Sequence, residues 1–234
     1  MPDCITPSRI IACFAFDDVM SLDVVGPLQV FASANGELER QGRARGYEVL
    51  IIADAAGPVP TSGGFKLYAD LGWRDLELNT VDTILIAGGD GINRVRQRPD
   101  ILEWLKQAEG KLARLGSVCS GALVLAEAGL LDGKMATTHW SRCDEMRKQF
   151  PAVQVIEDRL HSYDAQGVDG DPHIFTSAGV TAGIDLALAL VEADQGRAIA
   201  LAVARRLVMF LKRPGGQAQF SAYLTPAIGG TAQL

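Results

Sequence analysis

One cysteine of this sequence, Cys119, lies in a stretch whose neighbours suit a nucleophile. Residues 116–122 read GSVCSGA, so only small residues follow the cysteine. A strand that ends at Val118 and turns at once into a helix presents the next side chain at a sharp turn, the nucleophile elbow. Unpaired backbone N–H groups and the positive end of the helix dipole favour a thiolate there. We therefore predict an activated thiol with a lowered pKa, in preference to a core cysteine.

The other three cysteines lack this context. Cys4, Cys13 and Cys143 are far apart in the sequence, and no two cysteines form a C-x-x-C pair. Such spacing favours neither a disulfide framework nor a zinc site. We expect three reduced core cysteines, no metal and no cofactor.

Asp23 is an acidic residue that can exchange a proton with the thiol. It stands among apolar residues in the segment LDVVGP, residues 22–27, shortly after the first apolar run. Burial would raise its pKa and let it share a proton with Cys119. The alternative, which residue type alone favours, is a carboxylate that stabilises the first turn of a helix through the dipole.

The three histidines offer no certain partner for the thiol. His139 follows Ala136–Thr138 and precedes Trp140, so it either faces the site or caps a helix. His161 and His173 flank the acidic stretch Asp164–Asp171, for which we predict a surface hairpin with solvated charges. His139 is therefore the histidine that we predict as a ligand-binding residue.

Gly88 and Gly89 follow an apolar run and precede Asp90 and Gly91. A turn of this kind can offer backbone N–H groups to an anion or an oxyanion. The segment has neither the G-x-G-x-x-G nor the G-x-x-x-x-G-K-[ST] pattern, so nucleotide binding is not expected. We predict that Gly88 and Gly89 bind a small ligand.

The elements that position these residues are apolar runs alternating with helical periods. Near-continuous apolar runs are typical of strands buried on both faces of a parallel sheet, and they cover 9–16, 47–53, 81–87, 115–119 and 173–177. Helical periods cover 22–34, 100–112, 120–128, 139–150 and 184–212, the last as a helix pair or a helix kinked at Gly196. The alternation predicts a doubly wound α/β sheet with helices on both faces. Functional residues should then follow Phe16, Ala87 and Val118, at the carboxyl ends of strands.

Length and charge limit the classes of function. The 234 residues are 48% hydrophobic and 21% charged, which suits one large globular domain. A formal net charge of −6 lacks the positive field that binding to nucleic acid requires. Apolar stretches are too short to span a membrane, and the run 10–16 is followed by two aspartates rather than a cleavage site. We expect a cytoplasmic domain over residues 1–212 and a linker or tail over 213–234.

These segments, in this order, resemble the DJ-1/PfpI superfamily over about residues 9–191. The resemblance is carried by LDVVGP (22–27), IAGG (86–89), SVCSGA (117–122), GLLDGK (129–134), ATTHW (136–140) and TSAGVTAGID (176–185). It implies a flavodoxin-like sandwich, of the class I glutamine amidotransferase-like kind, with a cysteine at the nucleophile elbow.

Two branches of this superfamily share the segments. One comprises the amidase-like N-terminal sensor domains of GlxA-type AraC-family transcriptional regulators, which the sequence resembles further in AVARRL (202–207) and RPGGQAQF (213–220). The other is isocyanide hydratase, a dimeric enzyme. The longer match favours the sensor. It implies a homodimer that binds a small molecule near Cys119, Asp23 and the Gly88-Gly89 turn, and that reaches DNA only through a C-terminal helix-turn-helix domain outside these residues.

An enzyme is the alternative that the resemblance implies. In an isocyanide hydratase-like lyase, Cys119 attacks the isocyanide carbon and Asp23 exchanges protons with the adduct and water. The N–H groups of Ser120 and Gly89 then hold developing charge until an N-formamide leaves. Ser120 replaces the threonine of the hydratase but keeps a hydroxyl, and the absence of histidine at this position disfavours a Cys-His protease dyad. A third possibility is redox sensing by oxidation of Cys119.

Overall fold

A six-stranded parallel sheet forms the centre of the computed structural model, which describes residues 8–209 and 213–219. The strand order is β10-β7-β6-β1-β2-β5, and every neighbouring pair is parallel. The strands are β1 (Arg9–Phe14), β2 (Tyr47–Ala53), β5 (Leu71–Gly72), β6 (Val81–Ile86), β7 (Arg114–Val118) and β10 (Ile174–Ser177). The predicted α/β fold with a parallel sheet is confirmed.

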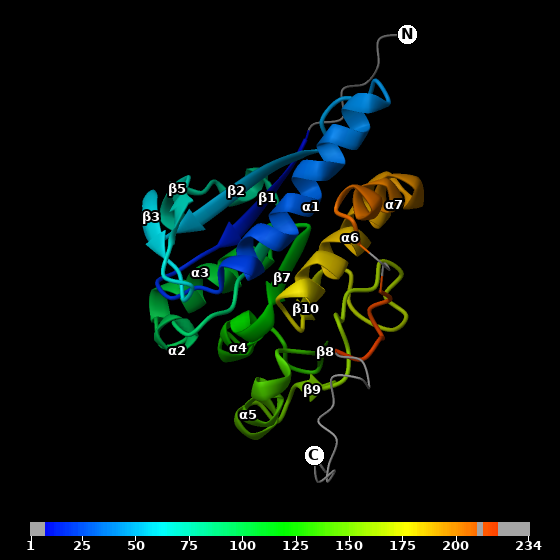
Figure 1. Ribbon diagram of the computed structural model, residues 1–234. Helices are drawn as coiled ribbons and strands as arrows, with labels where there is room; N and C mark the ends of the chain where they lie inside the picture. Colours follow the sequence, from blue (N-terminus) through cyan, green and yellow to red (C-terminus); the bar gives the residue numbers. More distant parts are fainter. Residues whose placement is uncertain (1–7, 210–212, 220–234) are drawn as a thin grey trace, which may run out of the picture.

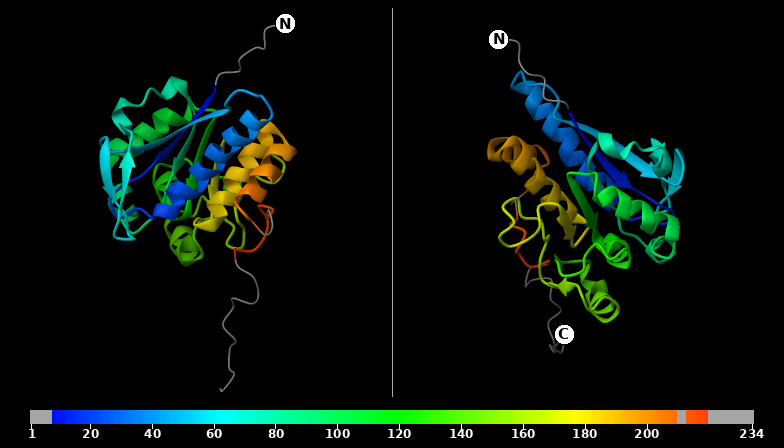
Figure 2. Two further views of the ribbon diagram at one scale, coloured as in Figure 1. Left: turned by 45° about the horizontal axis from the view of Figure 1, so that its top comes forward. Right: turned by 180° about the vertical axis from the view of Figure 1, so that it is seen from behind.

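Helices cover both faces of this sheet (Figures 1 and 2). On one face, three helices pack against one another: α1 (Ser21–Arg40), α6 (Thr181–Gln195) and α7 (Arg197–Arg206). The other face carries α2 (Ile92–Val95), α3 (Pro99–Glu109) and α4 (Ala122–Glu127). Beyond the sheet, at the lower end of Figure 1, lie β8 (Met135–Ala136), α5 (Cys143–Gln149) and β9 (Gln154–Val155).

Local sequence accounts for most of these elements. Gly196 adopts φ 88°, which an L residue rarely adopts, and it separates α6 from α7 as the predicted helix pair requires. The helix predicted from residue 139 begins instead as a 3-10 turn, Trp140–Arg142, and becomes α5 at Cys143. An antiparallel hairpin, β3 (Gly57–Pro60) and β4 (Lys66–Ala69), was not predicted, because two prolines interrupt its short first strand.

The acidic stretch 164–171 differs from its prediction. Tyr163 and Asp171 form an isolated parallel bridge, so this segment is a loop and no hairpin. The Asp164 carboxylate accepts hydrogen bonds from the N–H groups of Gln166, Val168 and Asp169, which fold the loop back on itself. His161 is only 5% exposed, so it belongs to the interior and not to a solvated surface.

The cysteines other than Cys119 are core residues where the structure describes them. Cys13 and Cys143 are 0% and 1% exposed, as predicted, and Cys4 lies outside the described residues. Among the described residues, every helix is too short or too polar to span a lipid bilayer.

Candidate functional site

The chain turns sharply at Cys119. Strand β7 ends at Val118, and Cys119 begins a 3-10 turn, Cys119–Gly121, that leads directly into α4. Cys119 adopts φ 58°, a left-handed conformation that is uncommon for a residue with a side chain and is often found at functional sites. Two glycines make room for it: a Cβ atom at Gly88 would lie 2.7 Å from the Cys119 Cβ, and one at Gly179 would lie closer still.

Asp23, the third residue of α1, is fully buried beside this turn. Its Oδ1 accepts a hydrogen bond from the Val180 N–H at 2.7 Å. The Cys119 thiol and the Gly88 N–H also interact with the carboxylate, but Oδ2 makes no hydrogen bond of ordinary length within the described residues. Burial raises the pKa of Asp23 to about 6, although these donors oppose the shift. The structure therefore brings together the two residues predicted to exchange a proton.

The predicted lowering of the Cys119 pKa is wrong. Burial and the nearby Asp23 carboxylate raise the pKa of this thiol, and the Ser120 N–H and hydroxyl only partly oppose them. Cys119 is 9% exposed, so solvent stabilises the charged form of its thiol only weakly.

Cys119 and Asp23 act as a pair that carries one negative charge near neutral pH. The carboxyl group loses its proton first, and its charge then opposes ionisation of the thiol. The thiol can pass its proton to Asp23 as the sulfur forms a bond to an electrophile, and Asp23 can return that proton later. The pair therefore suits chemistry or recognition at an electrophilic carbon.

Asp23 makes the stability of the folded state depend on pH. Its pKa rises from an ordinary 3.8 to about 6 on folding, so the folded state binds the proton more tightly than the unfolded state. The free energy of unfolding should therefore fall as pH rises from about 4 to 6, by about 3 kcal/mol from this residue, and then level off. Urea unfolding of wild type and Asp23→Asn across this range tests it, because the difference between the two curves isolates Asp23. Parallel curves would contradict it.

The Gly88-Gly89 turn, which follows the neighbouring strand β6, contacts the elbow through Ser120. The Ser120 hydroxyl accepts a hydrogen bond from the Gly89 N–H at 3.1 Å. The Gly88 carbonyl accepts one from Met20 N–H at 2.9 Å, at the start of α1. The Gly89 N–H predicted to hold a ligand's charge is thus engaged with Ser120, whereas the Ser120 N–H faces the Cys119 sulfur.

His139 lines a cavity of about 160 Å³ beside the elbow. Its Nδ1 lies 2.8 Å from the Ser141 hydroxyl, and burial together with Arg142 lowers its pKa. No hydrogen bond joins His139 to Cys119 within the described residues. The cavity is lined by His139, Trp140, Ala178, Gly179, Val180, Thr181, Ala182 and Gln219. The structure therefore places His139 in the wall of the pocket and not on the thiol.

The loop after β10 contributes site residues that the strand-end argument did not name. Gly179 packs against Cys119, and Val180 donates its N–H to Asp23. Val180 adopts φ 49° and ψ −115°, a strained conformation for a β-branched residue. A small Ala178-Gly179 pair directly after a buried strand was the available sequence signal.

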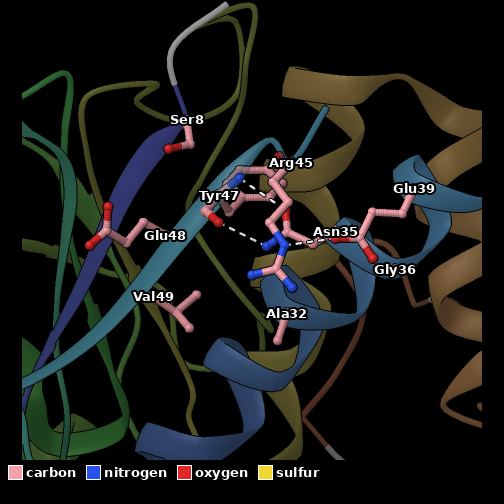
Figure 3. Close-up of a pocket in the computed structure, with 9 residues that line it drawn as sticks. All are labelled: Ser8, Ala32, Asn35, Gly36, Glu39, Arg45, Tyr47, Glu48 and Val49. Atoms are coloured by element: carbon pink, nitrogen blue, oxygen red, sulfur yellow. Dashed lines mark hydrogen bonds and ion pairs between the residues drawn. The ribbon is translucent and has the colours of Figure 1, made fainter. Parts of the chain in front are cut away.

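A larger cavity of about 510 Å³ lies away from Cys119, at the amino end of β2 (Figure 3). Its central polar group, the Asn35 amide of α1, is already bonded to Tyr47 O at 2.8 Å and to the Gly46 and Tyr47 N–H groups at 3.0 Å. Arg45 pairs with Glu39 in the same wall. Because these groups satisfy one another, we place the functional site at Cys119. Over residues 8–209 and 213–219, no cluster of three metal-ligating side chains is present.

Comparison with known proteins agrees with this geometry. Residues 9–193 match the DJ-1/PfpI family. A solved structure of a ThiJ/PfpI family protein from Pseudomonas syringae superposes with a TM-score of 0.73 at 25% identity, covering 92% of this chain and 84% of that one.

Two curated proteins are similar in sequence. The HTH-type transcriptional regulator CdhR of Pseudomonas aeruginosa is 33% identical over 72% of this chain, which covers 47% of the regulator. Isonitrile hydratase of Pseudomonas putida is 33% identical over 76% of this chain, which covers 68% of the hydratase. The chain thus spans about half the length of the regulator that it matches.

Proposed function

This chain belongs to the DJ-1/PfpI family, and we propose that it is the ligand-sensing domain of an AraC-family transcriptional regulator. The similarity to the regulator CdhR carries the proposal, since 72% of this chain matches only 47% of that protein. The helix-turn-helix part that binds DNA would then lie outside these residues. We propose residues 1–212 as the domain and 213–234 as a linker or tail, in a cytoplasmic homodimer. Light scattering should give twice the mass of one chain.

The pocket beside Cys119 supports the sensing of a small molecule. The adjoining cavity of about 160 Å³ suits a small molecule, and Trp140, an aromatic residue that is 54% exposed, lines it. We propose that Cys119, Asp23 and Ser120 form the reactive side of this pocket, and that Gly88, Gly89 and His139 help to hold the ligand.

A thermal-shift series with small nitrogen-containing metabolites tests the sensor. A compound at a hundred times its Kd stabilises the folded state by about 2.7 kcal/mol, which corresponds to about 5 °C or more in Tm. The shift should disappear in Trp140→Ala, which removes a cavity wall. It should persist in Phe65→Ala, a matched loss of an aromatic side chain that is 52% exposed elsewhere. A shift that survives Trp140→Ala would contradict binding in this cavity.

An isocyanide hydratase-like enzyme is the second candidate, favoured by the similarity to isonitrile hydratase. The Cys119 sulfur would add to the terminal carbon while its proton passes through Asp23 to that carbon, giving a thioimidate. Water would then add across the C=N bond, with its hydroxyl on the same carbon and its other hydrogen on nitrogen. As the C–S bond breaks, the hydroxyl proton would pass through Asp23 to sulfur, which regenerates the thiol and releases an N-substituted formamide. Incubation with an aryl isocyanide separates the candidates: many equivalents of formamide from wild type and none from Cys119→Ala would replace the sensor with the enzyme.

A further inference from the structure

A seven-residue segment after α7, residues 213–219, lies against the end of the domain that holds Cys119. Figure 1 shows it in orange and red, running from the loops beside α6 toward β8. The match to the DJ-1/PfpI family ends at residue 193, so this segment lies beyond the matched region. Its contacts with the domain are polar and specific, and they fall into three groups.

The first contact fixes the segment to α6. The Arg213 guanidinium donates to the Asp185 carboxylate from Nε at 3.0 Å and from Nη2 at 2.6 Å, and the Arg213 N–H donates to it at 3.2 Å. Nη2 also donates to the Thr181 hydroxyl at 3.1 Å. Asp185 is fully buried, so Arg213 compensates a charge that water does not reach.

The second contact is made by Gly215. Its carbonyl accepts hydrogen bonds from the N–H groups of Leu160 at 2.8 Å and His161 at 3.3 Å. A Cβ atom at Gly215 would lie 2.7 Å from the His161 Nδ1, so the glycine packs directly on the imidazole ring. The middle of the segment therefore rests on the domain.

The third contact reaches the pocket itself. The Gln219 Nε2 donates to Thr138 O at 3.0 Å and to Glu157 O at 2.6 Å, while its Oε1 accepts from Trp140 N–H at 3.1 Å. Gln219 also lines the cavity of about 160 Å³. One side chain thus lines the cavity and holds the turn that carries Trp140.

The two residues that the segment binds, Thr138 and Thr181, are themselves linked to the Cys119–Asp23 pair. Thr138, which Gln219 binds through its carbonyl, donates its hydroxyl to Cys119 O at 2.9 Å. Thr181, which Arg213 binds, follows Val180, the donor to Asp23. The segment therefore reaches Cys119 through one intervening residue, Thr138, and Asp23 through two, Thr181 and Val180.

We propose that residues 213–219 form a strap over the cavity beside Cys119, with Gln219 as a positioning residue whose hold on Thr138 and Trp140 changes when the cavity is occupied. The inference rests on the proposed sensing function. It suggests how occupancy of the cavity reaches the residues that follow, because the chain continues directly from Gln219. Coupling of this kind is reciprocal: occupancy changes the strap, and loss of the strap changes access to the cavity.

Alkylation of Cys119 by iodoacetamide tests the second half of this coupling. Gln219→Ala should raise the alkylation rate at Cys119 at least about fivefold over wild type, the lower end of ordinary coupling between sites. Gln217→Ala is the matched control, because among the described residues Gln217 contributes only a backbone N–H, to Pro214 O. Mass spectrometry follows each cysteine, and buried Cys13 and Cys143 should stay unmodified in a folded variant. Equal rates at Cys119 in a folded Gln219→Ala protein would overturn the proposal.

Hydrogen exchange in the wild type tests, without any substitution, whether occupancy of the cavity changes the strap. A carbamidomethyl group on Cys119 should speed exchange of the Leu160 and His161 amides, which donate to the strap, and leave α3 unchanged. Unaltered exchange at these amides would overturn the coupling even if Gln219→Ala fails to fold. Both measurements read the strap whatever the pocket binds, so their failure would leave ligand sensing standing, whereas formamide turnover would remove sensing and leave the strap.

Discussion

Replacement of Gly179 by alanine should cost at least about 4 kcal/mol of stability and displace the elbow. A Cβ atom there would overlap the Cys119 Cβ and lie 2.8 Å from the Cys119 backbone nitrogen. These neighbours belong to a backbone that cannot swing aside. Gly179 also adopts φ 91°, which adds the strain of an L residue in a conformation suited to glycine. Urea unfolding gives the cost, and alkylation of Cys119 reports the displaced thiol.

Gly196→Ala is the control that separates the two causes. Gly196 has nearly the same φ, 88°, but a Cβ atom there would meet nothing within 4 Å. Its cost should be that of backbone strain, about 1 to 3 kcal/mol. If the two variants lose equal stability, contact between residue 179 and the elbow is not what fixes the glycine.

The sheet was predictable because most of its strands are buried and mostly apolar. This holds for the runs that became β1, β2 and β6, and the signal is independent of distant residues. The two-residue strands β8 and β9 lack such a signal, since their pairing depends on where the loops around α5 bring them. Long α1 extended beyond its predicted end at Ala34 to Arg40, because Gly36 did not stop it.

The partners of the site were predictable, but their charges were not. Asp23 and Cys119 follow β1 and β7, whose carboxyl ends point to one edge of a parallel sheet, so their meeting follows from topology. The direction of the Cys119 pKa shift depends instead on burial and on the distance to a carboxylate from another segment. Gln219 was out of reach for the same reason, since only the folded chain brings it to Thr138.

Removal of the Arg213 side chain should be the most damaging change in the strap. Asp185 is fully buried, and burial raises its pKa even with the guanidinium beside it. Arg213→Ala leaves this carboxylate without its cation, which for a buried pair costs about 3 to 5 kcal/mol. The raised pKa of Asp185 should rise further, so the variant binds a proton that the unfolded chain releases. Its deficit against wild type should therefore grow as pH rises and shrink in acid.

A double-mutant cycle with Asp185→Asn shows whether the pair itself accounts for this loss. In the Asp185→Asn background no buried charge remains, so Arg213→Ala should cost far less than it does in wild type. An equal cost in both backgrounds would contradict the ion pair. A small cost in wild type, accompanied by faster alkylation of Cys119, has a different meaning: the strap has detached and water has reached Asp185. Unfolding energies and alkylation rates measured on the same four proteins therefore distinguish a strap that stays bound to the domain from a strap that detaches.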